Sequence, residues 1–279
     1  MSFDKTELFR GALIQHGPFN KRIYLMSIRD ANPDDLIEGM LEKCKIEGYT
    51  KIFAKVPLEY KRQFTSRGFT VEAEVPGFYN GYQASVFMGY YLSRQRMEED
   101  VDELNRVLSI AESRHGDDTV KTLACGFHMK RCTPDDVVQM ANVYQVVFPS
   151  YPFPIHDTEY LLETMKTHIH YFCVCKNDQI VSISSAEMDP VGQNVEMTDF
   201  ATLPGFRGHS FGQHLLKRME DHVQDYGIQL AYTIARACSP GMNITFSKRD
   251  YLYAGRLVNN TQISGRIESM NVWYKSLDN

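Results

Sequence analysis

The hydrophobic and polar positions in the first half of the chain predict a helix followed by strands. Asn32 stands where an N-cap is expected, Pro33 takes the first helical position, and Gly48 ends the helical pattern. The apolar runs that follow are separated by turn residues, and Asn80-Gly81 is a typical hairpin pair. We therefore expect strands at residues 49–57, 69–79 and 82–92, with a second helix at residues 58–68.

A charged segment separates the two halves of the chain. Residues 93–115 carry apolar positions at helical spacing, namely Met97, Val101, Leu104, Leu108 and Ala111. This pattern favours a solvated connecting helix with one buried stripe. Because Gly116 and two aspartates interrupt the pattern, we predict two domains. They are an N-terminal α/β domain with the connecting helix, residues 1–118, and a second domain, residues 119–279.

The second half alternates helices and strands. Thr133 and Pro134 open a helix with carboxylates in its first turn, and an aromatic loop follows at residues 149–154. The later pattern gives strands at 169–189, 194–204 and 228–237, helices at 159–168, 209–227 and 240–250, and two closing strands. This order predicts a mixed sheet with crossover helices, an α/β or α+β fold.

Composition excludes several classes of protein. The chain has 279 residues, a formal net charge of -5 and a pI near 6.0, whereas a nucleic-acid binder usually carries a basic field. No apolar run approaches the roughly 20 residues of a membrane span, and the first residues lack the apolar core of a signal peptide. The six cysteines lack disulfide or zinc spacing. We expect a cytoplasmic protein with reduced thiols, no metal, and no nucleic-acid or membrane partner.

A strand, a glycine-containing turn and a helix follow one another in residues 196–217. Small residues at Gly205, Gly208 and Gly212 let the backbone curl so that successive amides converge on one point. The following helix adds the positive end of its dipole, and Arg207 adds a full charge. Such a turn suits a pyrophosphate, although a purely structural junction has the same appearance. The sequence contains neither a GxGxxG motif nor the Lys-Ser/Thr ending of a nucleoside-triphosphate loop.

This turn resembles the acetyl-CoA signature of the GNAT N-acetyltransferase superfamily. Arg207 and Gly212 match the family pattern, while Ser210 stands where a glycine is usual. The order of elements from Thr133 to Lys275 is also that of the superfamily. The resemblance implies that acetyl-CoA is the cosubstrate and that it contacts Thr202, Leu203, Arg207, Gly208, His209, Ser210, Phe211, Gly212 and Asn243.

Longer motifs resemble the β-lysine N-acetyltransferases, which make N-epsilon-acetyl-β-lysine as a compatible solute. They are EMTDFATLP, FPSYPFP, RACSPGMN and LVNNTQISGRIESMNVWYKSL, with KIFAKVP and VPGFYNG in the first half. The resemblance covers nearly the full length and implies that the chain acetylates the N6 amine of β-lysine. Two other readings stay open: a GNAT enzyme acting on lysine or a polyamine, and a non-catalytic acyl-CoA-binding module. Assembly of the chain into a homodimer is a further alternative.

Acetyl transfer needs a neutral amine, so a carboxylate must remove the ammonium proton. Glu196 lies eleven residues before Arg207, the spacing of the glutamate base in related histone acetyltransferases, and is our first choice. Asp199 is the second. Strand alternation places it on the opposite face from Glu196, unless a bulge brings both to the cleft. Either carboxylate could instead be an edge ion-pair partner or bind the substrate ammonium. An amide near Leu203 is expected to hold the oxyanion.

Two further sets of residues follow from the resemblance. The position of the family's tyrosine acid holds Phe246, which leaves Tyr251, Tyr253, Cys238 or water to protonate the thiolate. The amine substrate is expected to contact Tyr151, Phe153, Arg236, Asn259, Asn260, Glu268 and Asn271, with Tyr274 in the same stretch.

The first half repeats the end of this fold in outline. Residues 51–91 give a strand, a helix, Gly68-Phe69 and two strands, and Phe64 precedes Gly68 as Phe246 precedes Asp250. We interpret the segment as a partial, degenerate copy without a phosphate turn, and hence without a coenzyme site. An unrelated small α/β domain remains the alternative.

Overall fold

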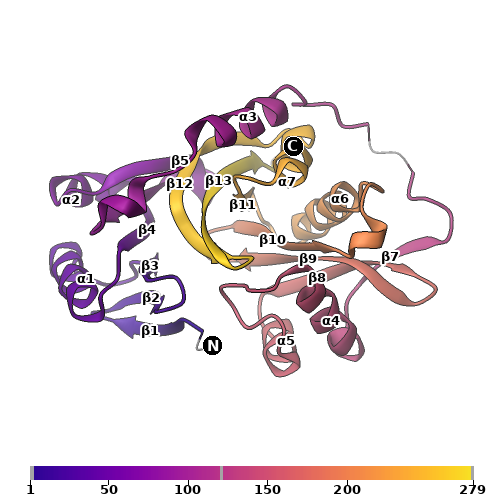
Figure 1. Cartoon of the computed structure of the whole chain (residues 1–279), viewed down its shortest axis with the longest axis horizontal. Helices are drawn as coiled ribbons and strands as arrows, with labels where there is room; N and C mark the ends of the chain where they lie inside the picture. The colour runs from indigo at the N-terminus through magenta and orange to yellow at the C-terminus, as the bar shows by residue number, and fades with distance from the viewer. Residues whose placement is uncertain (1–2, 120–121, 278–279) are drawn as a thin grey trace.

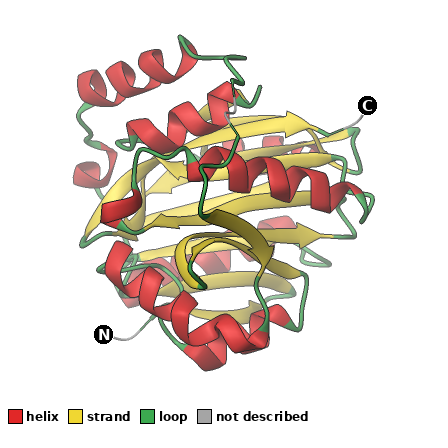
Figure 2. Cartoon of the chain, turned by 90° about the vertical axis from the view of Figure 1, so that its right-hand side faces the viewer, coloured by secondary structure: helices red, strands yellow, loops and turns green. Residues whose placement is uncertain are grey.

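The computed structural model describes residues 3–119 and 122–277 of the chain (Figure 1). Within these residues one mixed sheet of 13 strands forms in the order β1-β2-β3-β4-β6-β5-β12-β13-β11-β10-β9-β8-β7. Figure 2 shows helices on both outer sides of the sheet. This confirms the predicted mixed α/β sheet with crossover helices.

The N-terminal half contributes six neighbouring strands and two α-helices. The strands are β1 (Lys5–Phe9), β2 (Ala12–Gly17), β3 (Arg22–Ser27), β4 (Lys51–Pro57), β5 (Thr70–Tyr79) and β6 (Gln83–Tyr91). The helices are α1 (Pro33–Glu47) and α2 (Lys61–Ser66), with a 3₁₀ turn at Leu58–Tyr60. The predicted elements from residue 32 to residue 92 are confirmed. The first three strands were not predicted, although Ile14, Ile23 and Leu25 are fully buried there.

The C-terminal half contributes the other seven strands. They are β7 (Phe127–Arg131), β8 (Ile169–Lys176), β9 (Gln179–Asp189), β10 (Asn194–Thr202), β11 (Leu230–Arg236), β12 (Leu252–Ile263) and β13 (Arg266–Ser276). The helices are α4 (Val137–Val147), α5 (Thr158–Met165), α6 (Phe211–Gln224) and α7 (Pro240–Lys248), with 3₁₀ turns at Pro134–Asp136 and Pro204–Phe206. Helices α4 and α5 cover one face of this half, and α6 and α7 cover the other (Figure 1).

The helix in the charged segment between the two halves is shorter than predicted. A 3₁₀ turn at Arg94–Met97 is followed by α3 (Val101–Glu112), which packs against α7. Leu104 and Ala111 are buried as expected, but Met97 is 55% exposed and Val101 49% exposed. The predicted stripe is therefore wrong at its first turn, because the helix begins only after the N-cap Asp100. The division between residues 118 and 119 stays a prediction.

The two halves share one connection pattern. In each, two strands run parallel through a crossover helix, β3–α1–β4 and β10–α6–β11. In each, a further helix and two antiparallel strands follow. The last strand lies between the other two in both copies, in the orders β4-β6-β5 and β11-β13-β12. The aromatic contact after the helix also recurs: the Phe64 and Phe69 rings lie 5.0 Å apart, and the Phe246 and Tyr251 rings 5.1 Å apart. The predicted partial copy is confirmed in this connection pattern.

The copies meet where β5 pairs with β12, so the sheet runs through both halves. Gly255 of β12 lies opposite Ala73 of β5. Its φ is +147°, and a Cβ at this position would lie 2.1 Å from the Glu72 carbonyl oxygen. A side chain would therefore force the two strands apart.

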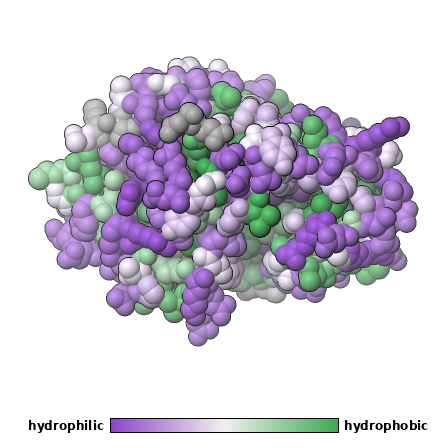
Figure 3. Space-filling model, turned by 180° about the vertical axis from the view of Figure 1, so that it is seen from behind, coloured by the Kyte–Doolittle hydropathy of each residue, from purple (hydrophilic) through white to green (hydrophobic). Residues whose placement is uncertain are grey.

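Apolar side chains from both halves form one core between them. Tyr24, Phe53 and Phe87 from the first half pack in the same cluster as Tyr232 and Leu257 from the second. By contrast, the outer face in Figure 3 is largely hydrophilic, with apolar side chains scattered over it. No described helix is both long and apolar enough to cross a bilayer.

Candidate active site

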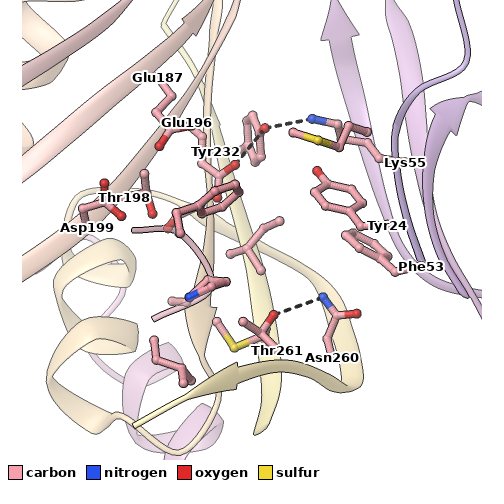
Figure 4. A pocket seen from close by; sticks show the side chains of 18 of the residues that line it. Tyr24, Phe53, Lys55, Glu187, Glu196, Thr198, Asp199, Tyr232, Asn260 and Thr261 are labelled. Atoms are coloured by element: carbon pink, nitrogen blue, oxygen red, sulfur yellow. Dashed lines mark hydrogen bonds between the residues drawn. The ribbon is translucent and has the colours of Figure 1, made fainter. Parts of the chain in front are cut away.

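A cavity of about 360 Å³ lies between the two halves (Figure 4). Its size is within the range of small-ligand sites. One wall comes from β3 and β4 of the first half and the other from β9, β10 and β11 of the second. The aromatic loop before α5 and the end of β12 complete the lining, with Phe148, Tyr151, Phe153, Asn260 and Thr261.

A bulge in β10 brings two carboxylates into the cavity. The pairing of β10 with β9 shifts register between Thr198 and Ala201, and Asp199 has a φ of +55°. Without the bulge, Asp199 would face away from Glu196. In Figure 4 both side chains lie on the same side of the cavity, beside Glu187 of β9. The predicted bulge is confirmed, and it assembles a cluster of three carboxylates.

Each of the two β10 carboxylates has hydrogen-bond donors. The Tyr232 hydroxyl donates to Glu196 Oε2 at 3.1 Å, and Lys55 Nζ of the first half donates to the Tyr232 hydroxyl at 3.2 Å. Asp199 accepts from Ser185 Oγ at 2.7 Å and from the Tyr151 hydroxyl. Glu196 is thus linked across the cavity to a lysine from the other half, as the dashed lines of Figure 4 show.

Burial is the main influence on the acidity of this cluster. Burial raises the pKa of Glu196, and Asp199 adds to this rise. Lys55 and the hydrogen bond from Tyr232 act in the opposite direction. Burial also raises the pKa of Asp199, against the donors Tyr151 and Ser185. The pKa of Glu187 is raised well above its ordinary value by burial and by its two carboxylate neighbours. The cluster therefore holds protons more tightly than exposed carboxylates do.

Lys55 is the cation of this cluster. Burial alone would lower the pKa of Lys55, but Tyr232, Tyr24 and Glu196 reverse that effect and raise it above the ordinary value. The amine therefore stays charged near neutral pH. It also lies near the rings of Phe78 and Tyr232, at 5.6 and 5.5 Å from their centroids.

The strands β10 and β11 separate beside the carboxylates. Their parallel pairing runs from Asn194 with Leu230 to Glu196 with Tyr232 and ends there. Both strands continue, β10 to Thr202 and β11 to Arg236. Backbone groups on the facing edges beyond this point are consequently not paired with each other.

The predicted phosphate turn has the expected shape. Gly208 and Ser210 have positive φ values of +88° and +58°, and the Ser210 side chain does not cap α6. In the described part of the chain, the amides of residues 208–212 donate to no protein acceptor. Arg207 is the exception, since its amide donates to the Pro204 carbonyl at 3.4 Å. Five residues, all exposed or half-buried except Phe211, thus present free amides at the N-terminus of a 14-residue helix.

Side chains around this turn pack on one another. The His209 ring stacks on Phe211 at 5.3 Å, and Phe127 of β7 contacts both rings. The Arg207 side chain is exposed and its Nε donates to the Thr202 carbonyl at 3.4 Å. The turn is therefore held in place from one side and accessible from the other.

Two predicted contacts near the coenzyme need correction. The Leu203 amide donates to the Val181 carbonyl at 2.9 Å, so it is not free to hold an oxyanion. Asn243 is fully buried: its Nδ2 donates to the carbonyls of Arg236 and Ser239, and its Oδ1 accepts from Asn271 and Trp273. Because every hydrogen-bonding position of this side chain is taken, it has none left for coenzyme A.

The predicted amine-binding residues divide into two groups. Tyr151, Phe153, Asn260 and Arg236 line the cavity. Asn259, Glu268 and Asn271 do not, and the prediction is wrong for these three side chains. Asn259 donates to carbonyls of the interdomain connection, Glu268 pairs with Arg236 and Arg266, and Asn271 binds Asn243.

Arg236 already has a counter-ion. Its Nε and Nη2 each lie 2.7 Å from a different oxygen of the buried Glu268, a bidentate ion pair. The cation expected to bind a substrate carboxylate is therefore neutralised within the protein.

Sequence reasoning missed most of the cavity wall from the first half. Arg22, Tyr24, Phe53 and Lys55 line it, and so do Tyr232 and Glu187 of the second half. One signal was available: Lys55 lies between apolar residues within β4, a position where a charged side chain is uncommon. That these strands face the second half's carboxylates could be known only from the tertiary structure.

None of the three candidate side chains for thiolate protonation lines the cavity among the described residues. Phe246 lines it and is fully buried, in contact with Tyr251. Tyr251 is fully buried as well, the Tyr253 ring packs on Trp273, and the Cys238 thiol donates to Glu268 at 3.2 Å.

Comparison with known proteins matches this architecture. The model of the acetyltransferase (GNAT) family matches residues 138–241. The β-lysine N(6)-acetyltransferase of Methanococcus maripaludis is 38% identical over 269 residues, 95% of this chain and 96% of its own. The enzyme of the same name from Methanosarcina mazei is 31% identical, over 81% of this chain and 91% of its own. Among solved structures, the ribosomal-protein-S18-alanine N-acetyltransferase from Escherichia coli covers 55% of this chain and 95% of its own, with 12% identity and a TM-score of 0.48.

The fold and the family match make this protein an acetyltransferase of the GNAT class. Given its relatives, the chain belongs to the GNAT family and, within it, to the group of the β-lysine N(6)-acetyltransferases. GNAT acetyltransferases use acetyl-CoA as the acetyl donor.

The raised pKa of Glu187 predicts a pH-dependent stability. Because the folded-state pKa lies above that of the unfolded chain, the stabilising contribution is complete at acidic pH and is lost as pH rises through the folded-state pKa. Glu187→Gln removes this loss. We expect the variant to melt about 2–4 °C above the parent protein at pH 8, with a gap that narrows toward pH 5.

Differential scanning fluorimetry across this pH range measures the effect. The exposed Glu163, on the surface of α5, supplies a matched control, Glu163→Gln, which should follow the parent at every pH. A constant gap between Glu187→Gln and the parent would contradict the electrostatic explanation.

Proposed function

We propose that this N-acetyltransferase transfers the acetyl group of acetyl-CoA to the N6 amine of β-lysine, giving the N-epsilon-acetyl derivative as a compatible solute in the cytoplasm. The single observation that carries the proposal is the position of Glu196. It lies where the β10–β11 pairing ends, inside the cavity, and is held there by Tyr232. The names of the curated relatives support β-lysine as the acceptor.

Glu196 has the properties of a general base for an amine. An aliphatic ammonium has a pKa near 10.4, so a base must take its proton before nitrogen can attack. Burial raises the pKa of Glu196, which makes its carboxylate a stronger proton acceptor than an exposed one. Tyr232 occupies only Oε2, which leaves Oε1 for the amine or a bridging water.

Asp199 and Glu187 supply the negative surroundings that an ammonium needs. Asp199 is oriented by two hydroxyl donors and is 7% exposed. With Glu196, these carboxylates attract the cationic end of the substrate and then hold the transferred proton. The Lys55 cation opposes the rise in the pKa of Glu196 that burial causes.

The transfer itself balances without a covalent enzyme intermediate. The ammonium proton moves to Glu196, the free amine forms a C–N bond with the thioester carbonyl carbon, and the C–S bond breaks. A thiolate with a pKa near 8.5 leaves without strong acid assistance. The cavity lining agrees with this, because Phe246, which cannot donate a proton, stands at the position of the family's tyrosine acid.

The turn at residues 207–212 is the proposed pyrophosphate site. Its amides without protein acceptors lie at the N-terminus of α6, and the exposed Arg207 side chain, bonded through Nε to the Thr202 carbonyl, adds a charge. His209 and Phe211 shape the side of the turn, while Thr202 and Leu203 end the open edge of β10 for the pantetheine arm.

The proposed charge at the turn gives a first prediction. Arg207→Gln should weaken acetyl-CoA binding by about 5–30-fold, because one charge-assisted contact to phosphate is lost. Arg218→Gln, the same change at an exposed position farther along α6, is the matched control and should shift affinity by less than about twofold. Isothermal titration calorimetry measures the acetyl-CoA affinity of both variants. Equal losses of affinity in Arg207→Gln and Arg218→Gln would refute a local contact between Arg207 and phosphate.

The base assignment gives a second prediction. Glu196→Gln should lower kcat by about 10²–10³-fold and leave acetyl-CoA affinity within about twofold, since the amide cannot take a proton. In the parent protein, kcat should rise with pH as Glu196 deprotonates, at a higher pH than an ordinary glutamate because its pKa is raised.

A matched change at the neighbouring carboxylate separates the base from the general charge of the cluster. Glu187→Gln should reduce kcat by less than about tenfold, because Glu187 lacks the Tyr232 hydrogen bond that orients Glu196. Steady-state kinetics over pH 5.5–9 measures both variants. Parent-like turnover of Glu196→Gln would exclude Glu196 as the base.

The acceptor is tested directly with a free-thiol assay. With saturating acetyl-CoA, we expect kcat/KM for β-lysine to exceed those for lysine and spermidine by at least about tenfold, with acetyl at N6 by tandem mass spectrometry. A higher kcat/KM for lysine or spermidine would mean that this amine, and not β-lysine, is the acceptor of the acetyl group.

A further inference from the structure

An arginine from the first half lines the cavity without an acidic partner. Arg22 begins β3, is 4% exposed, and shares the cavity-facing side of that strand with Tyr24 and Met26. The intervening Ile23 and Leu25 face the opposite core. Strand alternation therefore directs a guanidinium toward the site.

Half of this guanidinium is used by the protein and half is free. Nη1 donates to the Asn260 carbonyl at 2.5 Å and to Thr261 Oγ1 at 3.2 Å. Nε is buried with no hydrogen-bond partner, and Nη2 donates to no acceptor within residues 3–119 and 122–277. The edge formed by Nε and Nη2 is the one that binds a carboxylate through two parallel hydrogen bonds.

Nearby carboxylates do not neutralise Arg22. No described acidic group lies within ion-pair distance of it, and only Asp4 and Glu72 act on it from farther away. Asp4 accepts from the amides of Phe19 and Asn20, and Glu72 binds Lys51. A buried charge without a counter-ion is unfavourable for folding, so its retention needs another explanation.

Two other arginines show what a satisfied guanidinium looks like in this protein. Arg236 uses its Nε and Nη2 edge for Glu268, with both distances at 2.7 Å. Arg96, 6% exposed, donates to the carbonyls of Asn20 and Asn259 and to Thr50. Arg22 has the geometry of Arg236 but lacks the carboxylate.

The residue that holds Arg22 Nη1 also carries an unpaired acceptor. Asn260 is 1% exposed and lines the cavity, and its Oδ1 has no hydrogen-bond partner. Its backbone carbonyl is the one that holds Arg22 Nη1. A ligand that satisfies both groups must present a carboxylate to Arg22 and, next to it, a hydrogen-bond donor to Asn260 Oδ1.

We propose that Arg22 binds the carboxylate of an amino-acid acceptor through Nε and Nη2, while Asn260 Oδ1 accepts from the neighbouring ammonium. This inference rests on the proposed function and names the residues that select its substrate class. The opposite side of the cavity holds Glu187, Glu196 and Asp199, which suit the distant amine that is acetylated.

The charge arrangement explains selectivity for a zwitterion over a simple diamine. A diamine places no carboxylate on Arg22, so the guanidinium stays desolvated and unpaired when the cavity closes around the ligand. Burial lowers the pKa of Arg22 only to about 10, so the guanidinium remains cationic at neutral pH. The first half of the chain thus acts in substrate recognition, although it lacks the phosphate turn.

The test compares β-lysine with 1,4-diaminopentane, the same skeleton without the carboxylate. For Arg22→Met, we expect the ratio of kcat/KM values for the two acceptors to fall by about 30–300-fold, mainly through a higher KM for β-lysine. Arg96→Met removes an equally buried cation that does not line the cavity, and should keep the ratio within about threefold. An unchanged ratio in Arg22→Met would overturn the proposal.

A binding measurement keeps the test independent of turnover. β-Lysine should raise the melting temperature of the parent protein and of Arg96→Met but not that of Arg22→Met. If Arg22→Met does not fold, Arg22→Lys replaces it, and a parent-like β-lysine KM in that variant would refute bidentate recognition.

Failure of this inference can be distinguished from failure of the proposed function. If the parent enzyme prefers lysine over β-lysine, the β-lysine assignment falls, and the Arg22 test is repeated with lysine against 1,5-diaminopentane. If the parent prefers diamines to both amino acids, the carboxylate role of Arg22 is wrong.

Discussion

The separation of β10 from β11 after the pair Glu196–Tyr232 is the constraint on which the rest of the site depends. A continued pairing would close the edge of β10 and bury its backbone groups against β11. The bulge at Asp199 belongs to the same stretch and turns a second carboxylate inward. A short irregular segment therefore creates both the opening for an extended ligand and the acidic end of the cavity. The turn before α6 lies directly after this segment, so the three features are aligned by chain connectivity alone.

The cavity concentrates charge that is unfavourable for folding. Three carboxylates with raised pKa values lie on one side, and Arg22 and Lys55 come from the other half of the chain. Such groups lose hydration on burial, and only part of that loss is recovered through Tyr232, Tyr151 and Ser185. Strained or poorly compensated groups are common where binding supplies the missing interactions. The substrate is the natural source of those interactions here.

The crossover helices of the two halves differ at their N-termini. Helix α6 begins with free amides and no side-chain cap. Helix α1 begins with Asn32, whose side chain accepts from the amides of Asp34 and Asp35, and these carboxylates would repel a phosphate. The predicted absence of a coenzyme turn in the first half agrees with this geometry. Its sheet face, by contrast, carries Arg22 and Lys55 toward the second half.

The sequence by itself determined the elements of residues 32–92 and 133–277, the connection pattern and the phosphate turn, because caps, glycines and hydrophobic periodicity act over a few residues. It missed β7 and began the helix of the charged segment too early. It also indicated Glu196, Asp199, Tyr151, Phe153 and Asn260 as cavity residues. It could not show that Arg236 is paired with Glu268 or that Asn243 is enclosed, because hydrogen bonds between distant strands have no local signal. Only the tertiary structure placed Arg22 and Lys55 opposite the carboxylates, since that depends on β5 pairing with β12 across more than half of the chain.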